Sequence, residues 1–463
     1  MRLQLNSIIA TLAAALCASA FAAATPEELA KLGKELTPVG AEVAGNKEGT
    51  IPAYTGGQKA LPAGFNPESA KRWTDPYAAE KPTFAITAEN MAQYEDKLLG
   101  SAKEMFKRFP KTFRIDVYPT HRSVWLPDWI NENTLKNASS AKILPNGYGV
   151  TGVFGGMPFP IPKSGIEVWW NNELRYKGVY HQNNVATWMV DSAGRKSLNG
   201  AFDSSLYFPI YDQDTPRDKF LAGDGTYYMV HSDYSAPAAR VGEVSLFINW
   251  LDAEKRPTKG WAYTPGTRRV RSTPDLAYDT PCPGYNGGIT MDDILMTYGT
   301  QDRVDWKLVG KKEIYVPYNN YTQQFVTPSS KIMTPNHPNP DEMRFELHRM
   351  WVIEGTPKKG VRHIYSKKVL YVDEDLGGSH METYDQGGKM FRAGWSTTVQ
   401  LYDIGVPYTA GNFFFDFSTG SYWLGSHPGD ASVKGLKYPK DSSWKKTRLE
   451  IYSPEYVQAN GVR

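Results

Sequence analysis

A run of four strand-like segments between Arg344 and Trp395 constrains the fold of this chain more than any other feature. The first segment places Phe345, Leu347 and Ile353 on one face of an extended chain, and a two-residue apolar period is typical of a sheet rather than a helix. Paired glycines separate the later segments. They predict tight turns there, because glycine readily adopts the positive φ that such turns need. Four consecutive antiparallel strands of this kind predict a strongly curved sheet or an unclosed barrel.

The same alternation of strands and turns recurs along most of the chain. Val241–Leu251 and Thr397–Ser418 are predicted strands, and Gly260–Ser272 is a predicted hairpin with a Pro-Gly turn. Glu167–Tyr176 is also predicted to be a strand. The fold class is therefore mainly β (α+β), with a curved antiparallel sheet as its main element.

One long helix is predicted, at Ala88–Phe109, and Pro110 ends it. Apolar side chains recur along it at helical spacing, while its lysines lie mainly elsewhere. We expect the helix to pack as a lid across the mouth or concave face of the sheet. The apolar positions of the lid are Met91, Tyr94, Leu98 and Phe106.

The first 22 residues read as a Sec-type signal peptide rather than as structure. Arg2 precedes the apolar run Ile8–Leu16, and an A-x-A cleavage site occupies positions 20–22. The residues before Cys17 are in the wrong order for a lipobox, so we expect an exported protein without a lipid anchor. Residues 23–110 (helix, extended arm and lid) and residues 111–463 (the β domain) are expected to form one compact unit, because no linker divides them.

Composition excludes several classes of protein. The chain has 52 basic and 49 acidic residues, a balance that gives no reason to expect nucleic acid as a partner. No second apolar run approaches the ~20 residues needed to cross a bilayer. Cys282 is the only cysteine after the signal peptide, so the exported protein has no internal disulfide and depends on its hydrophobic core.

No motif in the sequence predicts a catalytic residue, a cofactor or a metal. Residues 147–152 match G-x-G-x-x-G, but the prolines that follow forbid the helix that a nucleotide site requires. The acidic run Asp373–Asp375 lacks the last ligand of a calcium loop, which favours a solvated hairpin turn. The eight histidines have no metal-ligand spacing, and His348 with His363 is interpreted as a cross-strand polar pair. Cys282 is interpreted as a loop thiol, and no nucleophile-elbow serine is present, so we do not expect an enzyme.

Aromatic residues make up 13% of the chain. This is more than a β protein needs for folding, so some strand tryptophans and tyrosines are expected to line an unfilled hollow. Trp250 and Trp351 are the candidates on the strands, and the four apolar lid residues are the candidates above them. Such a hollow would bind a lipid or another hydrophobic molecule.

The densest basic cluster comprises Arg268, Arg269 and Arg271 on the Pro-Gly hairpin. One interpretation is a solvated strand edge that prevents sheet-to-sheet aggregation. The other is a docking surface for an acidic partner or a headgroup.

Several longer segments resemble a proteobacterial family of exported proteins of unknown function, commonly described as outer-membrane lipoprotein-sorting proteins. These segments are Leu36–Glu42, Phe159–Glu167, Tyr263–Arg271, Asp305–Glu313 and Arg362–Lys368. The family is similar in fold to the lipoprotein carriers LolA and LolB, whose unclosed barrel binds acyl chains. The resemblance implies a carrier in the periplasm of a Gram-negative bacterium. It also implies an exporter of the resistance-nodulation-division superfamily and an outer-membrane protein as partners.

Two functions therefore remain open. One is a periplasmic carrier of a lipid or other hydrophobic molecule between the inner and outer membranes. The other is a non-carrier adaptor or structural subunit of an export complex, which would use the basic hairpin as its contact. Co-purifying lipid would distinguish the carrier from the adaptor.

Overall fold

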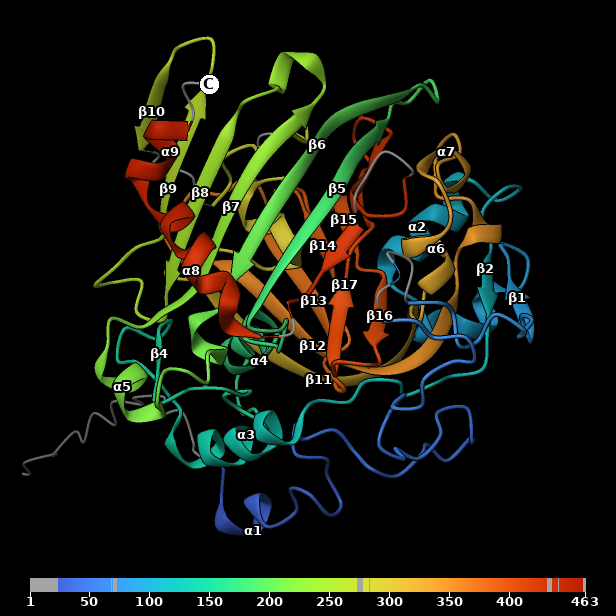
Figure 1. Ribbon diagram of the computed structural model, residues 1–463. Helices are drawn as coiled ribbons and strands as arrows, with labels where there is room; N and C mark the ends of the chain where they lie inside the picture. Colours follow the sequence, from blue (N-terminus) through green and yellow to red (C-terminus); the bar gives the residue numbers. More distant parts are fainter. Residues whose placement is uncertain are drawn as a thin grey trace, which may run out of the picture.

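One large sheet organises the computed structural model (Figure 1). The structure describes residues 24–460 except 68, 70–72, 273–277, 283, 431–434 and 440. The predicted signal peptide, residues 1–22, lies outside the described residues. Among the helices of the described residues, none is both long and apolar enough to cross a membrane.

The main sheet of the described residues has 16 strands, 14 of them in the order β1-β2-β12-β13-β14-β15-β18-β19-β5-β6-β7-β8-β9-β10. β11 pairs with β12, and β20 pairs with β5. The strands are β1 (Phe84–Ile86), β2 (Ile115–Val117), β5 (Tyr180–Val190), β6 (Lys196–Tyr207), β7 (Thr226–Ala236), β8 (Val244–Trp250), β9 (Lys259–Thr264), β10 (Arg269–Ser272), β11 (Val304–Pro317), β12 (Phe345–Pro357), β13 (Lys367–Asp373), β14 (Ser379–Tyr384), β15 (Met390–Trp395), β18 (Asn412–Asp416), β19 (Ser421–His427) and β20 (Gly435–Lys437). β1 and β10 stand at opposite ends of this order, so the sheet is not closed into a barrel.

Smaller elements surround the sheet. Two short pairs of strands are β3 (Lys142–Ile143) with β4 (Val150–Thr151) and β16 (Thr398–Leu401) with β17 (Val406–Thr409). The α-helices are α1 (Pro26–Leu29), α2 (Gly100–Arg108), α3 (Asp128–Ser140), α4 (Gly165–Glu173), α5 (Arg217–Ala222), α6 (Tyr321–Phe325), α7 (Ser329–Ile332), α8 (Lys445–Arg448) and α9 (Pro454–Asn460). The 3₁₀ helices are η1 (Met91–Lys97), η2 (Pro209–Tyr211), η3 (Ala238–Arg240), η4 (Met291–Met296), η5 (Pro340–Glu342), η6 (Ser442–Trp444) and η7 (Leu449–Tyr452).

The predicted meander is confirmed. β12, β13, β14 and β15 are consecutive antiparallel neighbours, with register pairs such as Met350↔Asp373 and Leu370↔Met381. The mainly β, unclosed architecture is also confirmed. In Figure 1, β5 to β10 form a wall in front of β11 to β15, and β18 and β19 link the two walls in the strand order.

The prediction of one continuous helix over Ala88–Phe109 is wrong at the centre of that segment. It is divided into η1 and α2, and between them the backbone of Leu98 is extended and bridges Tyr315 of β11. Pairing with the sheet therefore overrides the helical period here. α2 begins at Gly100, where a Cβ atom would lie 2.8 Å from Oε2 of Glu382, so a larger residue here would require the Glu382 side chain to shift.

The predicted strand Glu167–Tyr176 is also wrong, because most of it is helix α4. Ser164 and Glu167 form a capping box that starts the helix, since each side chain accepts a hydrogen bond from the other residue's backbone N–H. Every residue of α4 is buried. A helix that is buried all round has no polar face, and its sequence therefore lacks the period that identifies amphipathic helices.

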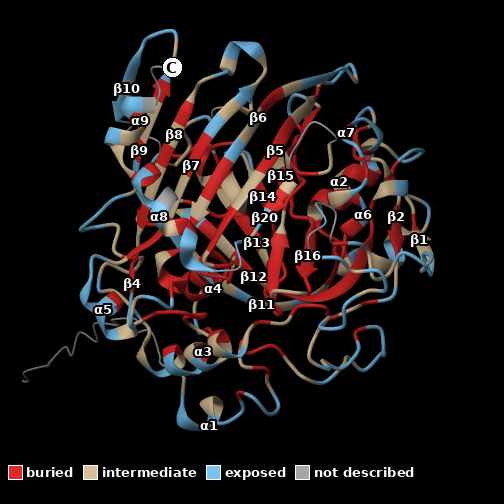
Figure 2. Cartoon of the chain, viewed as in Figure 1, coloured by how far each residue is buried: buried red, intermediate tan, exposed pale blue. Residues whose placement is uncertain are grey.

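The sheet is buried on both faces over much of its area (Figure 2). α8, η7 and α9 cover the outer face of β7 to β9, where Ile451, Tyr452 and Val457 pack with Leu246 and Tyr263. α2 packs in a separate core with β11, β12 and β15. The opposite face of β5 to β9 is the one that encloses a cavity.

Candidate ligand-binding cavity

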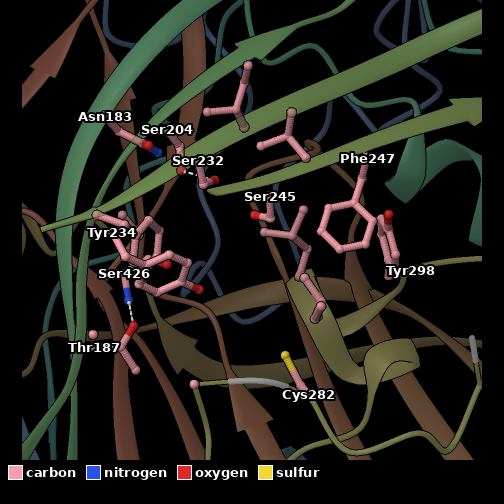
Figure 3. Close-up of a pocket in the computed structure, with 18 of the residues that line it drawn as sticks. Asn183, Thr187, Ser204, Ser232, Tyr234, Ser245, Phe247, Cys282, Tyr298 and Ser426 are labelled. Atoms are coloured by element: carbon pink, nitrogen blue, oxygen red, sulfur yellow. Dashed lines mark hydrogen bonds between the residues drawn. The ribbon is translucent and has the colours of Figure 1, made fainter. Parts of the chain in front are cut away.

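A cavity of about 640 Å³ lies against β5 to β9 (Figure 3). These strands form one wall, and η4, β17 and the segment around Tyr285 form the other. Because successive strand residues point to opposite faces, the cavity is lined mainly by alternate side chains along part of each of β5 to β8. The inward-facing residues of the strands include His181, Asn183, Leu206, Val230 and Phe247.

Strand register arranges the inward side chains in rows across the sheet. Asn183, Ser204, Ser232 and Ser245 are direct partners on four adjacent strands, and the hydroxyls of Ser204 and Ser232 are 2.7 Å apart. The neighbouring row is more apolar and consists of His181, Leu206, Val230 and Phe247. The wall therefore combines an apolar surface with a band of small hydrogen-bonding groups, as in many small-molecule sites.

The opposite wall contains strained backbone. Leu295 and Met296 in η4 have φ of 53° and 68°, a left-handed conformation that is uncommon for residues other than glycine. Such strain persists where the surrounding structure holds it and is frequent at ligand sites. Leu295 lines the cavity, and Met296 is fully buried behind it.

Cys282 and Tyr298 also line this wall (Figure 3). Burial raises the pKa of the Cys282 thiol to about 12, so the thiol is protonated at neutral pH. A protonated thiol is a poor nucleophile, and the prediction of a loop thiol therefore fits its surroundings. Burial likewise raises the pKa of the Tyr298 hydroxyl, so that hydroxyl is neutral at the same pH.

The deep end of the cavity is cationic. Arg175 and Lys177 follow α4 and line the cavity beside His181. Burial lowers the pKa of Arg175 to about 10 and that of Lys177 to about 8, so both side chains remain charged at neutral pH. Burial also lowers the pKa of His181 to about 3, which makes its ring neutral.

The outer end of the cavity is more exposed and its charges are paired. The Arg240 guanidinium lies 3.8 Å from the centre of the Tyr234 ring. Its Nη2 is 2.8 Å from a carboxylate oxygen of Glu243. Both residues line the cavity, so this end carries no net charge from the pair.

None of the six cavity residues predicted from the sequence lines this cavity. On β8, Ser245 and Phe247 face inward, so the alternation turns Trp250 outward, where its Nε1 lies 3.3 Å from Asp224. The Nζ of Lys311 lies over the Trp351 ring, 4.7 Å from the centre of that ring. The four predicted lid residues, Met91, Tyr94, Leu98 and Phe106, belong to the core of β11 and β12 instead.

The basic cluster predicted for partner binding lies at the free edge of the sheet. Arg269 and Arg271 are exposed on β10, opposite Thr264 and Ala262 of β9. Arg268 occupies the turn with a φ of 51°. The role of this basic cluster in contacting a partner stays a prediction.

The acidic run Asp373–Asp375 is not the predicted solvated turn. All three carboxylates are buried, and Arg122 donates two hydrogen bonds to Asp375 at 2.8 and 2.7 Å. His348, Asp373 and Asp375 bring potential metal ligands within 4.8 Å of one another. The Tyr318 hydroxyl donates to Asp373 at 2.8 Å, so donors of the protein already occupy these oxygens.

The predicted pair of His348 and His363 is also wrong. His348 is the register partner of Ile314 on β11 and stacks on Tyr318. His363 lies before β13, with its Nε2 3.2 Å from Asp292. The two histidines therefore have separate partners, because β12 and β13 begin to pair only at Met350↔Asp373.

Comparisons with known proteins place the chain among uncharacterised relatives. A family described as a protein of unknown function, DUF1329, matches residues 85–458. An uncharacterized protein of Pseudomonas aeruginosa is 37% identical over 456 residues, which cover 97% of this chain and 96% of the relative.

The similar solved structures are more distant. A DUF1329 family protein from Desulfovibrio piger has a TM-score of 0.42 and 14% identity, and the match covers 63% of this chain and 96% of that one. A domain from Vibrio parahaemolyticus named for outer-membrane lipoprotein sorting has a TM-score of 0.42 and 12% identity, over 64% and 98% of the two chains. A LolA superfamily protein from Nitrosomonas europaea has a TM-score of 0.35 and 12% identity, over 63% and 99%.

Proposed function

The chain belongs to the DUF1329 protein family, and we propose that it carries one lipid or other hydrophobic molecule in the cavity against β5 to β9. The observation that supports this function is the cavity itself. Its volume of about 640 Å³ falls within the ~300–1,000 Å³ of small-molecule sites. Its walls combine buried aromatic and aliphatic side chains with a band of small polar groups and with charged groups at each end.

A hollow of this size that side chains do not fill is unusual in a protein. Protein cores are close-packed, and groups that face a void lose attractive contacts. The neighbouring cores contain large side chains such as Trp395 and Phe413 that are fully buried. A sequence that fills those cores with aromatic side chains yet leaves this hollow open supports a role for the hollow in binding.

The proposed place of action is the periplasm, between the inner and outer membranes. The predicted signal peptide and the sequence resemblance support this location. The same resemblance suggests an exporter of the resistance-nodulation-division superfamily and an outer-membrane protein as partners. Arg268, Arg269 and Arg271 offer an exposed basic edge for an acidic surface on such a partner.

A pair of variants on β7 tests the binding function. Val230 faces the cavity and Met229, its neighbour on the same strand, faces away from it. Val230→Trp should block the hollow at the middle of its apolar row and abolish the thermal stabilisation that fatty acids and phospholipids give the wild type. Met229→Trp should retain that stabilisation. Wild-type melting curves that no lipid shifts would refute the carrier function and leave the adaptor function in its place.

A further inference from the structure

Among the described residues, the cation at the deep end of the cavity has no ionic partner. Arg175 is 3% exposed, and its two Nη atoms donate to neutral oxygens, Oδ1 of Asn172 and Oγ1 of Thr409, both at 2.8 Å. Its Nε has no hydrogen-bond partner among the described residues. A buried donor without a partner is costly, so this end of the cavity has binding capacity that the protein does not use.

Lys177 adds a second positive charge at the same place. Its Nζ donates to the backbone carbonyl of Glu173 at 2.7 Å and lies 5.7 Å from the centre of the Phe208 ring. The charges of Arg175 and Lys177 repel each other, and this repulsion contributes to the lowered pKa of Lys177. Both cations therefore lie in one electrostatic environment.

Glu173 is the nearby carboxylate that attracts both cations. Its Oε1 accepts a hydrogen bond from the Tyr227 hydroxyl at 2.9 Å. No ion pair joins Glu173 to Arg175 or Lys177 within the described part of the chain. Two cations and one carboxylate leave one net positive charge, and a buried charge without a counter-charge is unfavourable.

We propose that the cargo is an amphiphile with a single carboxylate, whose anionic end lies at Arg175 and Lys177. This inference rests on the proposed carrier function and specifies the chemistry of the cargo. One negative charge neutralises the single excess positive charge, and the carboxylate oxygens supply acceptors for the Arg175 Nε and the Lys177 ammonium. The neutral ring of His181 has an unbonded Nδ1 beside this position among the described residues.

The apolar part of the amphiphile follows from the same geometry. Phe208 stacks on both His181 and Tyr228 next to the two cations. From there the apolar row of Leu206, Val230 and Phe247 crosses the wall, and Phe202 and Tyr234 lie toward the exposed end. An extended alkyl chain would bury its surface along this wall while its charged end stays at the deep end.

Calorimetric titration with dodecanoate, dodecanol and dodecylammonium tests the inference. All three have the same chain length and differ in the charge of the head group. The wild type should bind dodecanoate about tenfold or more tightly than dodecanol, as expected for a hydrogen bond to a charged group. It should bind dodecylammonium most weakly.

Variants of Lys177 and a control at the other end of the cavity locate the effect. Lys177→Met should remove most of the preference for dodecanoate while dodecanol binding stays within about threefold, and Lys177→Arg should restore the preference. The double variant Arg240→Met with Glu243→Gln removes the paired charges at the other end of the cavity without changing its net charge, so it should leave the preference unchanged. Circular dichroism would confirm that each variant is folded.

The outcomes separate this inference from the proposed function. Equal binding of dodecanoate and dodecanol by the wild type would overturn the carboxylate specificity and leave a carrier of neutral lipids. A preference that persists in Lys177→Met and is lost in the Arg240→Met, Glu243→Gln double variant would place the anion at the wrong end and also overturn the inference. If none of the three ligands binds, the carrier function fails as well.

Discussion

Replacing Arg122 with methionine should destabilise the protein far more than the same change at Arg114. The Arg122 side chain is 2% exposed, donates two hydrogen bonds to Asp375 and lies 3.6 Å from Glu374. It also donates to the backbone carbonyl of Glu42 at 2.7 Å. Removal of one partner from such a buried network leaves carboxylates without a counter-charge, which costs about 3–5 kcal/mol.

Arg114 is a matched control because it too contacts two carboxylates, those of Asp116 and Asp341. Its side chain is 37% exposed, and surface ion pairs contribute only ~0–1 kcal/mol. Urea unfolding, followed by tryptophan fluorescence, measures the free energy of unfolding of both variants. Asp375→Asn combined with Arg122→Met should recover part of the loss, because the second change removes the unpaired charge. Equal losses for the two single variants would refute the argument that burial determines the cost.

Three further predictions follow from single residues. Burial raises the pKa of Asp373 to about 6, so between pH ~4 and 6 the folded state keeps a proton that the unfolded state has released. The free energy of unfolding should therefore fall from pH 4 to 6, by up to roughly 1.4 kcal/mol per pH unit relative to Asp373→Asn. Parallel pH profiles of the two proteins in urea unfolding would contradict this. Lys177, with its pKa near 8, should lose its charge between pH 7 and 9, so dodecanoate affinity should fall while dodecanol affinity stays constant in calorimetry. Phe106 is 1% exposed, and the centre of its ring lies 4.8 Å from that of Phe113. Phe106→Ala should therefore lower the free energy of unfolding by ~3–5 kcal/mol. In the same assay Leu61→Ala, at a 54% exposed position, should lower it by less than ~0.5 kcal/mol.

The local parts of the fold could be predicted from the sequence. The meander of β12 to β15 follows from a two-residue apolar period and glycine turns, which neighbouring residues determine. The failure at Leu98 has a distant cause, because the bridge from Leu98 to Tyr315 joins residues far apart in sequence. The buried acids at 373–375 escaped prediction for the same reason, since Arg122 lies 253 residues before Asp375.

The sequence predicted that a hollow exists but not where it lies. Aromatic richness indicated a hollow, yet the tryptophans on β8 and β12 point elsewhere, because one residue of register decides which face a side chain occupies. The row of polar side chains across the sheet, which begins with Asn183 on β5 and ends with Ser245 on β8, exists only because these strands pair. Near its start β5 contains the polar run His181–Asn184, which marks polar side chains in a largely buried strand, but this run does not alternate and so does not identify the residues that face the cavity.

Native mass spectrometry of the protein purified from its native source tests the carrier function most directly. The wild type and Met229→Trp should each carry one co-purifying molecule, identifiable after release as an amphiphile with a carboxylate. Val230→Trp, purified in the same way, should be free of it. A wild-type protein that carries no small molecule, or a Val230→Trp protein that carries the same molecule in equal amount, would contradict the account of this cavity as the cargo site.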